Sequence, residues 1–238
     1  MSSMQIPRSV SLTIQYFLDE WIPPRLRDSK LLMKLPMVIV LRQHSLDFMT
    51  FKERFWSLSA SEISELYLRT EAVQSLQGDT DLNRRCFERL VEEISDKSVL
   101  EVGCGRGLLA GTLSVDNAVT ACDVVVPDVL GDRFPNVDFI EANIEGLPFE
   151  DGYFDCVVCT HTLEHVRDLP QALSELRRVA RNDLYIVVPR QRPYRYTFSL
   201  HTQFFPYEWS IWNAFGFSEN ASLERLGDWY YHESIYAG

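Results

Sequence analysis

Short apolar runs alternate with segments of helical periodicity from about Gly78 onward. One helix is expected from a cap at Asp81 to Ile94, because its apolar side chains recur on a single stripe. Another is expected from about Leu169 to Val179. Expected strands end at 102, 122, 140, 159 and 188. Strands and helices that alternate in this way predict an α/β fold with a doubly wound, mostly parallel sheet.

The end of the chain has a different pattern. Two β-prone stretches, Ala221–Leu226 and Trp229–Tyr236, are separated by Gly227-Asp228. A glycine and an aspartate between two such stretches indicate a hairpin. We therefore expect an antiparallel strand to join the sheet at its end.

Residues 1–77 are predicted to form a helical extension or cap, broken at Pro23-Pro24. The extension either covers a ligand site or only packs against the rest of the chain. Its longest apolar run, Leu31 to Leu41, contains Lys34 and Pro36 and is too short to span a bilayer. We interpret the run as a core or interfacial segment, with contact to a membrane surface as the alternative.

The stretch Val99–Gly107, VLEVGCGRG, is the most informative part of the sequence. An apolar run that ends in alternating glycines predicts a buried strand turning sharply into a helix, where bare backbone lies close to a ligand. Backbone N–H groups at such a helix start can bind a polar group. Glu101 just before the first glycine would repel a phosphate but could pair with an ammonium group. Asp123, about twenty residues further on, suits a ribose diol. The pattern therefore suits a ligand that has an amino group and a ribose but no phosphate, and S-adenosylmethionine is such a ligand.

Composition narrows the class of protein further. The chain of 238 residues has a net charge of −11, which argues against a protein that grips nucleic-acid phosphates. No signal peptide or transmembrane segment is evident, and five cysteines fit a reducing cytosol, so a cytoplasmic location is expected. Cys156 and Cys159 form a CxxC, but they lie three apart on an expected strand and therefore point to opposite faces. We interpret them as core residues.

The chain resembles class I S-adenosylmethionine-dependent methyltransferases over roughly residues 82–237. The resemblance rests on the glycine loop, Asp123, the stretch from Asn143 to Phe149, and the sequence Phe154-Asp155 that leads into Leu163-Glu164-His165-Val166. It implies a Rossmann-like, seven-stranded sheet whose last strand is antiparallel. The methyltransferase domain would span residues 78–238, with an acceptor-side insertion at 190–209.

The resemblance also implies roles for individual residues. The loop residues Glu101, Gly103, Cys104 and Gly105 would surround the methionine part of the cofactor, and Asp123 would bind the ribose hydroxyls. At the next strand ends, Val124 would pack on the adenine, and Asn143 with the backbone of Ile144 would contact the edge of the adenine. Cys159 and Thr160 would lie beside the methyl donor. Asp123 could instead cap a turn, and Asn143 could be an ordinary loop residue.

His161, Glu164 and His165 spell HxxEH. On a helix these three side chains would share one face, which could hold a divalent metal. We favour the simpler interpretation, in which His165 packs or caps and no metal binds. His161 is one candidate general base, because an imidazole titrates near neutrality and this one is expected near the methyl donor. His201 is the other.

Arg190, Arg192, Tyr194 and Arg195 follow the fifth strand, where open α/β sheets place their binding crevice. Arginines beside aromatic rings suit an anionic or planar acceptor, such as a sugar derivative or an aromatic metabolite. A solvated basic turn is the alternative.

The sequence thus predicts methyl transfer from S-adenosylmethionine to an oxygen or nitrogen of a small acceptor. A noncatalytic protein that binds the cofactor or a partner is an alternative. A nicotinamide-dependent oxidoreductase is disfavoured by the glycine spacing and by Glu101.

Overall fold

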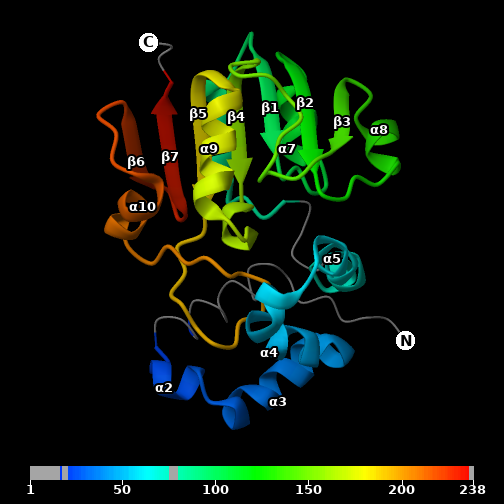
Figure 1. The fold of residues 1–238 in the computed structure, drawn as a ribbon, viewed down its shortest axis with the longest axis vertical. Coiled ribbons are helices and arrows are strands. Elements are labelled where there is room, and N and C mark those ends of the chain that lie inside the picture. Colours follow the sequence, from blue (N-terminus) through cyan, green and yellow to red (C-terminus); the bar gives the residue numbers. More distant parts are fainter. Residues whose placement is uncertain (1–16, 18–20, 75–79, 236–238) are drawn as a thin grey trace. The chain divides into compact units, whose positions relative to one another are not determined.

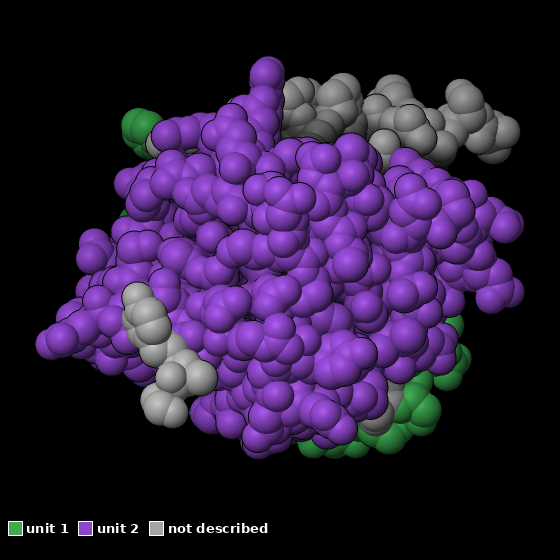
Figure 2. Space-filling view, turned by 90° about the horizontal axis from the view of Figure 1, so that it is seen from above, with its two compact units in different colours: residues 1–79, 191–202 green, residues 80–190, 203–238 purple. Residues whose placement is uncertain are grey.

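A computed structural model describes residue 17 and residues 21–74 and 80–235. The chain divides into two compact units, coloured separately in Figure 2. Unit 1 comprises residues 1–79 and 191–202, and unit 2 comprises residues 80–190 and 203–238. Most of the stretch 190–209, expected as an insertion of the methyltransferase domain, thus clusters with the N-terminal helices. The expected boundary at residues 77 and 78 lies outside the described residues.

Unit 2 is built on a seven-stranded sheet of order β3-β2-β1-β4-β5-β7-β6 (Figure 1). Its strands are β1 (Ser98–Val102), β2 (Ala118–Asp123), β3 (Val137–Glu141), β4 (Phe154–Thr160), β5 (Ala180–Val188), β6 (Ala221–Arg225) and β7 (Trp229–Ser234). The first five strands are parallel, and β7 pairs antiparallel with both β5 and β6. The predicted doubly wound sheet and its terminal hairpin are therefore confirmed. Tyr236, expected in the last strand, lies outside the described residues.

Helices cover both faces of this sheet. They are α6 (Arg84–Glu93), α7 (Leu108–Leu113), α8 (Val129–Arg133), α9 (Leu169–Val179) and α10 (Glu208–Phe215), with one 3-10 turn, η4 (Leu163–His165). One core joins α9 and α10 to the face that carries Val157 and Cys159, and a second joins α6 and α7 to the face that carries Cys156 and Val158. The two cysteines thus point to opposite faces, as expected.

The cap of the first helix differs from the prediction. Asn83, and not Asp81, caps α6, and its side-chain oxygen accepts a hydrogen bond from the Cys86 N–H at 3.1 Å. Asparagine and aspartate cap helices about equally well, so the sequence alone does not separate the two positions.

Unit 1 contains α2 (Pro24–Arg27), α3 (Lys30–Leu41), α4 (Ser45–Arg54) and α5 (Ala60–Gln74), with the 3-10 turns η1 (Arg42–His44) and η2 (Phe55–Ser57). Its core combines Met37 and Phe51 from the helices with Tyr196 and Leu200 from the later segment. The buried Arg27 guanidinium donates to the Tyr196 carbonyl at 2.5 Å. Among the described residues, no helix is long and apolar enough to cross a membrane.

Candidate functional site

The loop between β1 and α7 requires glycine at the positions the sequence singles out. Gly103 has a φ of 78°, and a Cβ atom added there would lie 1.9 Å from Oγ1 of Thr162. Gly105 has a φ of 50°, but nothing lies within 4 Å of its added Cβ. Gly103 is therefore closed in by protein, whereas Gly105 has open space beside it for a ligand.

Protein acceptors already bind several N–H groups of this loop. The N–H groups of Gly103 and Cys104 both donate to the Cys122 carbonyl, at 2.8 and 3.1 Å, and Gly107 donates to the Cys104 carbonyl at 2.9 Å. The Gly105 N–H donates to Oδ2 of Asp123 at 2.9 Å. These bonds fix the conformation of the loop. The expectation that N–H groups at the start of α7 bind a polar group of the ligand stays a prediction.

Two carboxyl groups supply hydrogen-bond acceptors beside the same loop. Glu101 is buried, and its Oε2 has no hydrogen-bond partner within the described part of the chain. Burial raises the pKa of Glu101 to about 8, with a smaller contribution from the charge of Asp123, while the Ala110 backbone N–H opposes the shift. Burial also raises the pKa of Asp123, against the opposing effect of the Gly105 and Val124 N–H groups. A ligand that brings a cation and hydroxyl donors would satisfy both carboxyl groups.

The next strand ends carry the residues expected around an adenine. Val124 exposes 44% of its surface, so it offers an apolar face next to Asp123. Because β2 pairs with β3, and the Ala142 N–H donates to the Asp123 carbonyl at 2.9 Å, Asn143 follows the neighbouring strand end. The Asn143 side-chain oxygen accepts from the Glu145 N–H at 2.9 Å, and Ile144 is buried.

Cys159, Thr160 and His161 end β4. Cys159 and Thr160 are buried, and the Cys159 side chain packs within the core, so only its backbone could border a ligand. His161 has a left-handed φ of 52°, and its N–H donates to the Val187 carbonyl at 2.9 Å.

The imidazole of His161 lies between two carboxylates. Its Nδ1 is 3.3 Å from Oε1 of Glu164, and its Nε2 is 3.4 Å from Oδ2 of Asp228. Burial lowers the pKa of His161, but Asp228 and Glu164 outweigh that effect and raise it to about 10. The two carboxylates therefore favour the charged form of the His161 imidazole.

The HxxEH stretch does not form an α-helix. His161 and Thr162 precede η4, a single 3-10 turn, so the i, i+3 and i+4 spacing does not place three side chains on one α-helical face. The stretch does bring Nδ1 of His161 to 3.3 Å from Oε1 of Glu164, and one possible ligand atom each of Glu164 and His165 lie within 4.8 Å of one another.

The residues expected on the acceptor side are divided between the units. Arg190 belongs to unit 2, as the last residue of its first segment. Arg192, Tyr194, Arg195 and His201 belong to unit 1. Tyr194 is buried, with the Arg27 guanidinium carbon 4.9 Å from the centre of its ring. Arg195 is exposed, with Nη2 2.5 Å from Oε1 of Glu53. Nδ1 of His201 lies 2.6 Å from Oε1 of Gln191.

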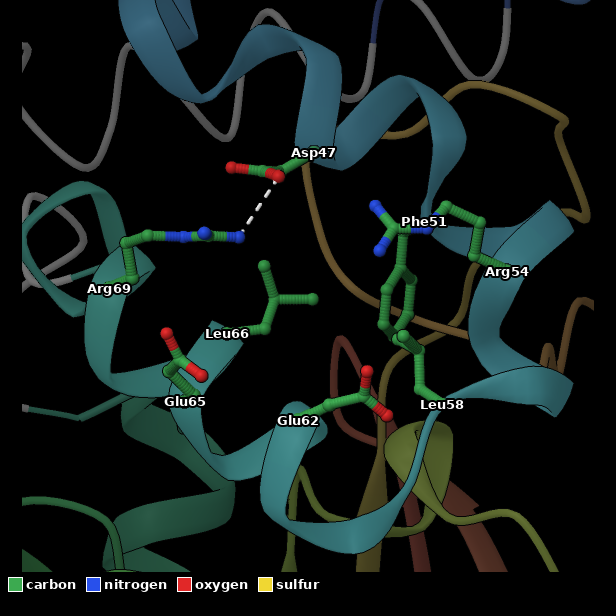
Figure 3. A pocket seen from close by; sticks show the side chains of 8 residues that line it. All are labelled: Asp47, Phe51, Arg54, Leu58, Glu62, Glu65, Leu66 and Arg69. Carbon is green, nitrogen blue, oxygen red and sulfur yellow. Dashed lines mark hydrogen bonds and ion pairs between the residues drawn. The ribbon is translucent and has the colours of Figure 1, made fainter.

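Unit 1 also contains a small cavity between α4 and α5, with a volume of about 150 Å³ (Figure 3). Figure 3 shows Arg69 joined to Asp47 by a dashed line, beside the apolar side chains of Phe51 and Leu66. Nη2 of Arg69 lies 3.0 Å from Oδ1 of Asp47. Small-molecule sites generally have volumes of about 300 Å³ or more, so we assign no ligand to this cavity.

Two residues of this site were not singled out by sequence reasoning. Thr162 packs against Gly103, and Asp228 both approaches His161 and accepts from Nδ2 of Asn83 at 2.7 Å. The sequence predicts Asp228 only as part of a hairpin turn, because no local pattern relates it to His161, 67 positions earlier.

The doubly wound sheet with its terminal hairpin, together with the glycine loop and its two carboxyl groups, makes unit 2 similar to the cofactor-binding domain of class I S-adenosylmethionine-dependent methyltransferases. The site fits that cofactor, because Oε2 of Glu101 is buried without a hydrogen-bond partner among the described residues, and the Asp123 carboxylate lies beside Gly105, which has open space next to it.

Comparisons with known proteins agree with this class. Residues 100–188 match the family described as a methyltransferase domain. A probable S-adenosylmethionine-dependent methyltransferase of Mycobacterium tuberculosis is 34% identical over 116 residues, which cover 48% of this chain and 42% of that protein. A ubiquinone/menaquinone biosynthesis C-methyltransferase of Campylobacter jejuni is 24% identical over 140 residues, which cover 54% of this chain and 60% of that protein. The chain thus spans less than two-thirds of either relative.

A solved structure supports the fold independently. The 1,6-didemethyltoxoflavin-N1-methyltransferase of Burkholderia thailandensis, solved with S-adenosylhomocysteine, matches with a TM-score of 0.52 at 19% identity. The match covers 75% of this chain and 92% of that protein.

Proposed function

We propose that this protein transfers a methyl group from S-adenosylmethionine to an oxygen or nitrogen of a small acceptor. The observation that carries the proposal is the pair of carboxyl groups beside the open side of Gly105. Glu101 brings a buried oxygen without a partner among the described residues, and Asp123 is anchored by the N–H groups of Gly105 and Val124.

In the proposed reaction, the acceptor's lone pair attacks the sulfonium methyl carbon. The new bond to oxygen or nitrogen forms as the carbon–sulfur bond breaks, and the acceptor's proton leaves to a base or to water. The products are S-adenosylhomocysteine and the methylated acceptor. The protein's main contribution would be to hold the nucleophile, the methyl group and the sulfur in line and to exclude water.

The cofactor would lie along the ends of β1, β2 and β3. We assign its methionine part to the loop Glu101, Gly103, Cys104 and Gly105, and its ribose to Asp123. Its adenine would rest on Val124, with Asn143 and the Ile144 backbone at the edge, and the backbone of Cys159 and Thr160 would border the methyl group. The exposed apolar surface of Val124 supports the adenine contact.

The two candidate bases stand in different environments. The carboxylates beside His161 favour its charged form, so we propose that His161 positions the turn after β4 and does not remove the acceptor's proton. His201 remains our candidate base. A hydrogen bond from its Nδ1 to Gln191 puts the proton on Nδ1 and the basic lone pair on Nε2.

The acceptor that we favour is an aromatic metabolite. A relative of Rickettsia conorii, 28% identical over 109 residues, is named a ubiquinone biosynthesis O-methyltransferase, which supports this choice over a sugar derivative. The arginines Arg190, Arg192 and Arg195, with Tyr194, are our proposed acceptor-side residues for an anionic substituent.

Calorimetric titration tests the proposal at its first step. S-adenosylhomocysteine should bind and NAD should not, and Asp123→Ala should weaken the binding by about 1–3 kcal/mol. Asp138→Ala is the matched control, because Asp138 is an exposed carboxylate on β3. Preferential binding of NAD would instead support an oxidoreductase.

Turnover is then measured with labelled S-adenosylmethionine and a panel of aromatic, anionic and sugar acceptors. Methyl transfer to a panel member that is lost in His201→Gln supports the proposed base. Tight cofactor binding without transfer to any of them would favour a noncatalytic cofactor-binding protein.

A further inference from the structure

Helix α3 is apolar on its outer side as well as on its inner side. Met33, Met37 and Leu41 point into the core of unit 1. On the outside, Leu31, Leu35 and Ile39 expose 84%, 67% and 66% of their surface, and Leu32, Val38 and Val40 are also exposed. Scattered exposed leucines are ordinary, but six large apolar side chains together on a helix of 12 residues are typical of a binding surface.

Basic side chains outnumber acidic ones along this segment, because Asp28 is the one acidic residue from Arg25 to Arg42. Lys30 and Lys34 are exposed on α3 itself, and Arg25 and Arg42 are exposed just before and just after it. The helix has no acidic residue, although the whole chain has a net charge of −11. The local charge therefore complements an anionic partner and is opposite in sign to that of the chain as a whole.

The length of the helix limits how it could meet a lipid bilayer. Twelve residues extend about 18 Å, well short of the roughly 30 Å of a hydrocarbon core. A short helix with an apolar outer face and basic residues instead suits the plane of the interface. Its leucines would reach the acyl chains, and the long lysine side chains would extend to the headgroups.

We propose that the α3 surface, defined as Arg25, Arg42 and the exposed side chains of α3, binds the surface of an anionic membrane. A second copy of the chain fits less well as the occupant. If the same patch paired on two copies, the four basic side chains of one copy would approach the four of the other. No acidic residue of α3 would offset their repulsion. The inference does not depend on the proposed methyl transfer.

Co-sedimentation with lipid vesicles tests this proposal. The protein should bind phosphatidylcholine vesicles that contain phosphatidylglycerol much more tightly than vesicles of phosphatidylcholine alone, and high salt should weaken the binding. Leu31→Gln, Leu35→Gln and Ile39→Gln together should weaken it at least about tenfold. Lys30→Gln and Lys34→Gln should each weaken binding to the anionic vesicles roughly fivefold.

The matched control is Leu68→Gln, which removes an exposed leucine of α5 in the same unit. Circular dichroism checks that each variant is folded. Equal binding by the wild type and the triple variant would overturn the proposal. The proposal would also be overturned if the wild type failed to bind vesicles and instead formed a dimer that the triple variant abolishes. Sedimentation velocity detects such a dimer.

Discussion

At the scale of single residues, the most informative side chain is His161, whose residue type alone suggests a base. Its environment argues against that role, because Nδ1 lies 3.3 Å from Glu164 and Nε2 lies 3.4 Å from Asp228, and both carboxylates favour the charged imidazole. A sequence reveals that a histidine is present but not which carboxylates lie around it. Asp228 lies in the turn between β6 and β7, and its contact with His161 is a long-range one that no local sequence pattern indicates.

His161 should contribute stability that depends on pH. Its folded pKa of about 10 lies above the ordinary 6.5, so the ion pairs stabilise the fold fully below pH 6.5 and progressively less as pH rises toward 10. The free energy of unfolding of the wild type should therefore fall toward that of His161→Gln over this range, as measured by urea denaturation. A difference between the two proteins that does not change with pH would contradict the buried imidazolium.

Glu101 should release a proton when the cofactor binds. With a pKa of about 8 the free protein holds this carboxyl mostly protonated at pH 7, and an ammonium group beside it would favour the charged form. S-adenosylhomocysteine should thus displace close to one proton at pH 7. Calorimetry in buffers of different ionisation enthalpy measures that release.

The control for this measurement is Glu101→Gln, which keeps the shape of the side chain but cannot titrate. The proposed placement of the ammonium group fails if the wild type and Glu101→Gln exchange the same number of protons with the buffer.

At the scale of elements, the central strands β1, β4 and β5 were predictable because each contains a buried apolar run. The glycine loop was predictable for a related reason, since alternating glycines after such a run have few other uses. The exposed β6 was predictable only as one arm of a hairpin around Gly227-Asp228. The 3-10 turn at Leu163–His165 was not, because one turn is too short for any periodicity to distinguish it from an α-helix. The apolar run Leu31 to Leu41 was expected as a core or interfacial segment, but which side chains of α3 point inward and which are exposed required the structure.

Alanine at two glycines of the loop should have different effects. Gly103→Ala adds a Cβ that collides with Thr162 at a positive φ, so we expect a loss of roughly 2–4 kcal/mol in stability. Gly105→Ala has open space and loses only about 1–2 kcal/mol through its φ, but the new methyl group enters the proposed cofactor site. It should stay folded and bind S-adenosylhomocysteine much more weakly.

Thermal denaturation and calorimetry on both variants separate these effects. Gly131→Ala in α8 is the control, because nothing lies within 4 Å of its added Cβ and its φ is not positive. The cofactor placement is contradicted if Gly105→Ala binds S-adenosylhomocysteine as tightly as Gly131→Ala does.

At the scale of the whole molecule, the chain builds unit 1 from two separate stretches. The sequence marked residues 190–209 as unusual because arginines and aromatic residues gather there, and an acceptor site was the natural interpretation. Part of that aromatic character serves packing instead, because Tyr196 and Leu200 lie in the core beside Met37 and Phe51. Composition cannot distinguish an aromatic residue buried in a core from one that lines a ligand-binding site.

Tyr196→Ala should loosen unit 1 selectively. Removing this buried ring should cost about 3–5 kcal/mol in the unit that contains it. Hydrogen–deuterium exchange should then accelerate in α3 and α4 and stay slow in β1, β4 and β5. Trp56→Ala, which removes an exposed ring of the same unit, should change exchange little. Acceleration spread evenly over both units would show that they do not open separately.

The two-part construction of unit 1 also has a consequence for how the protein is made. A ribosome adds about 5–20 residues each second, and N-terminal domains commonly fold while the rest is still being synthesised. Here the helices of residues 24–74 are translated before β5, and Tyr196 and Leu200 follow only after all of β5. The core of unit 1 is therefore completed late. A nascent chain stalled before residue 200 should be far more sensitive to protease in this region than one stalled beyond it.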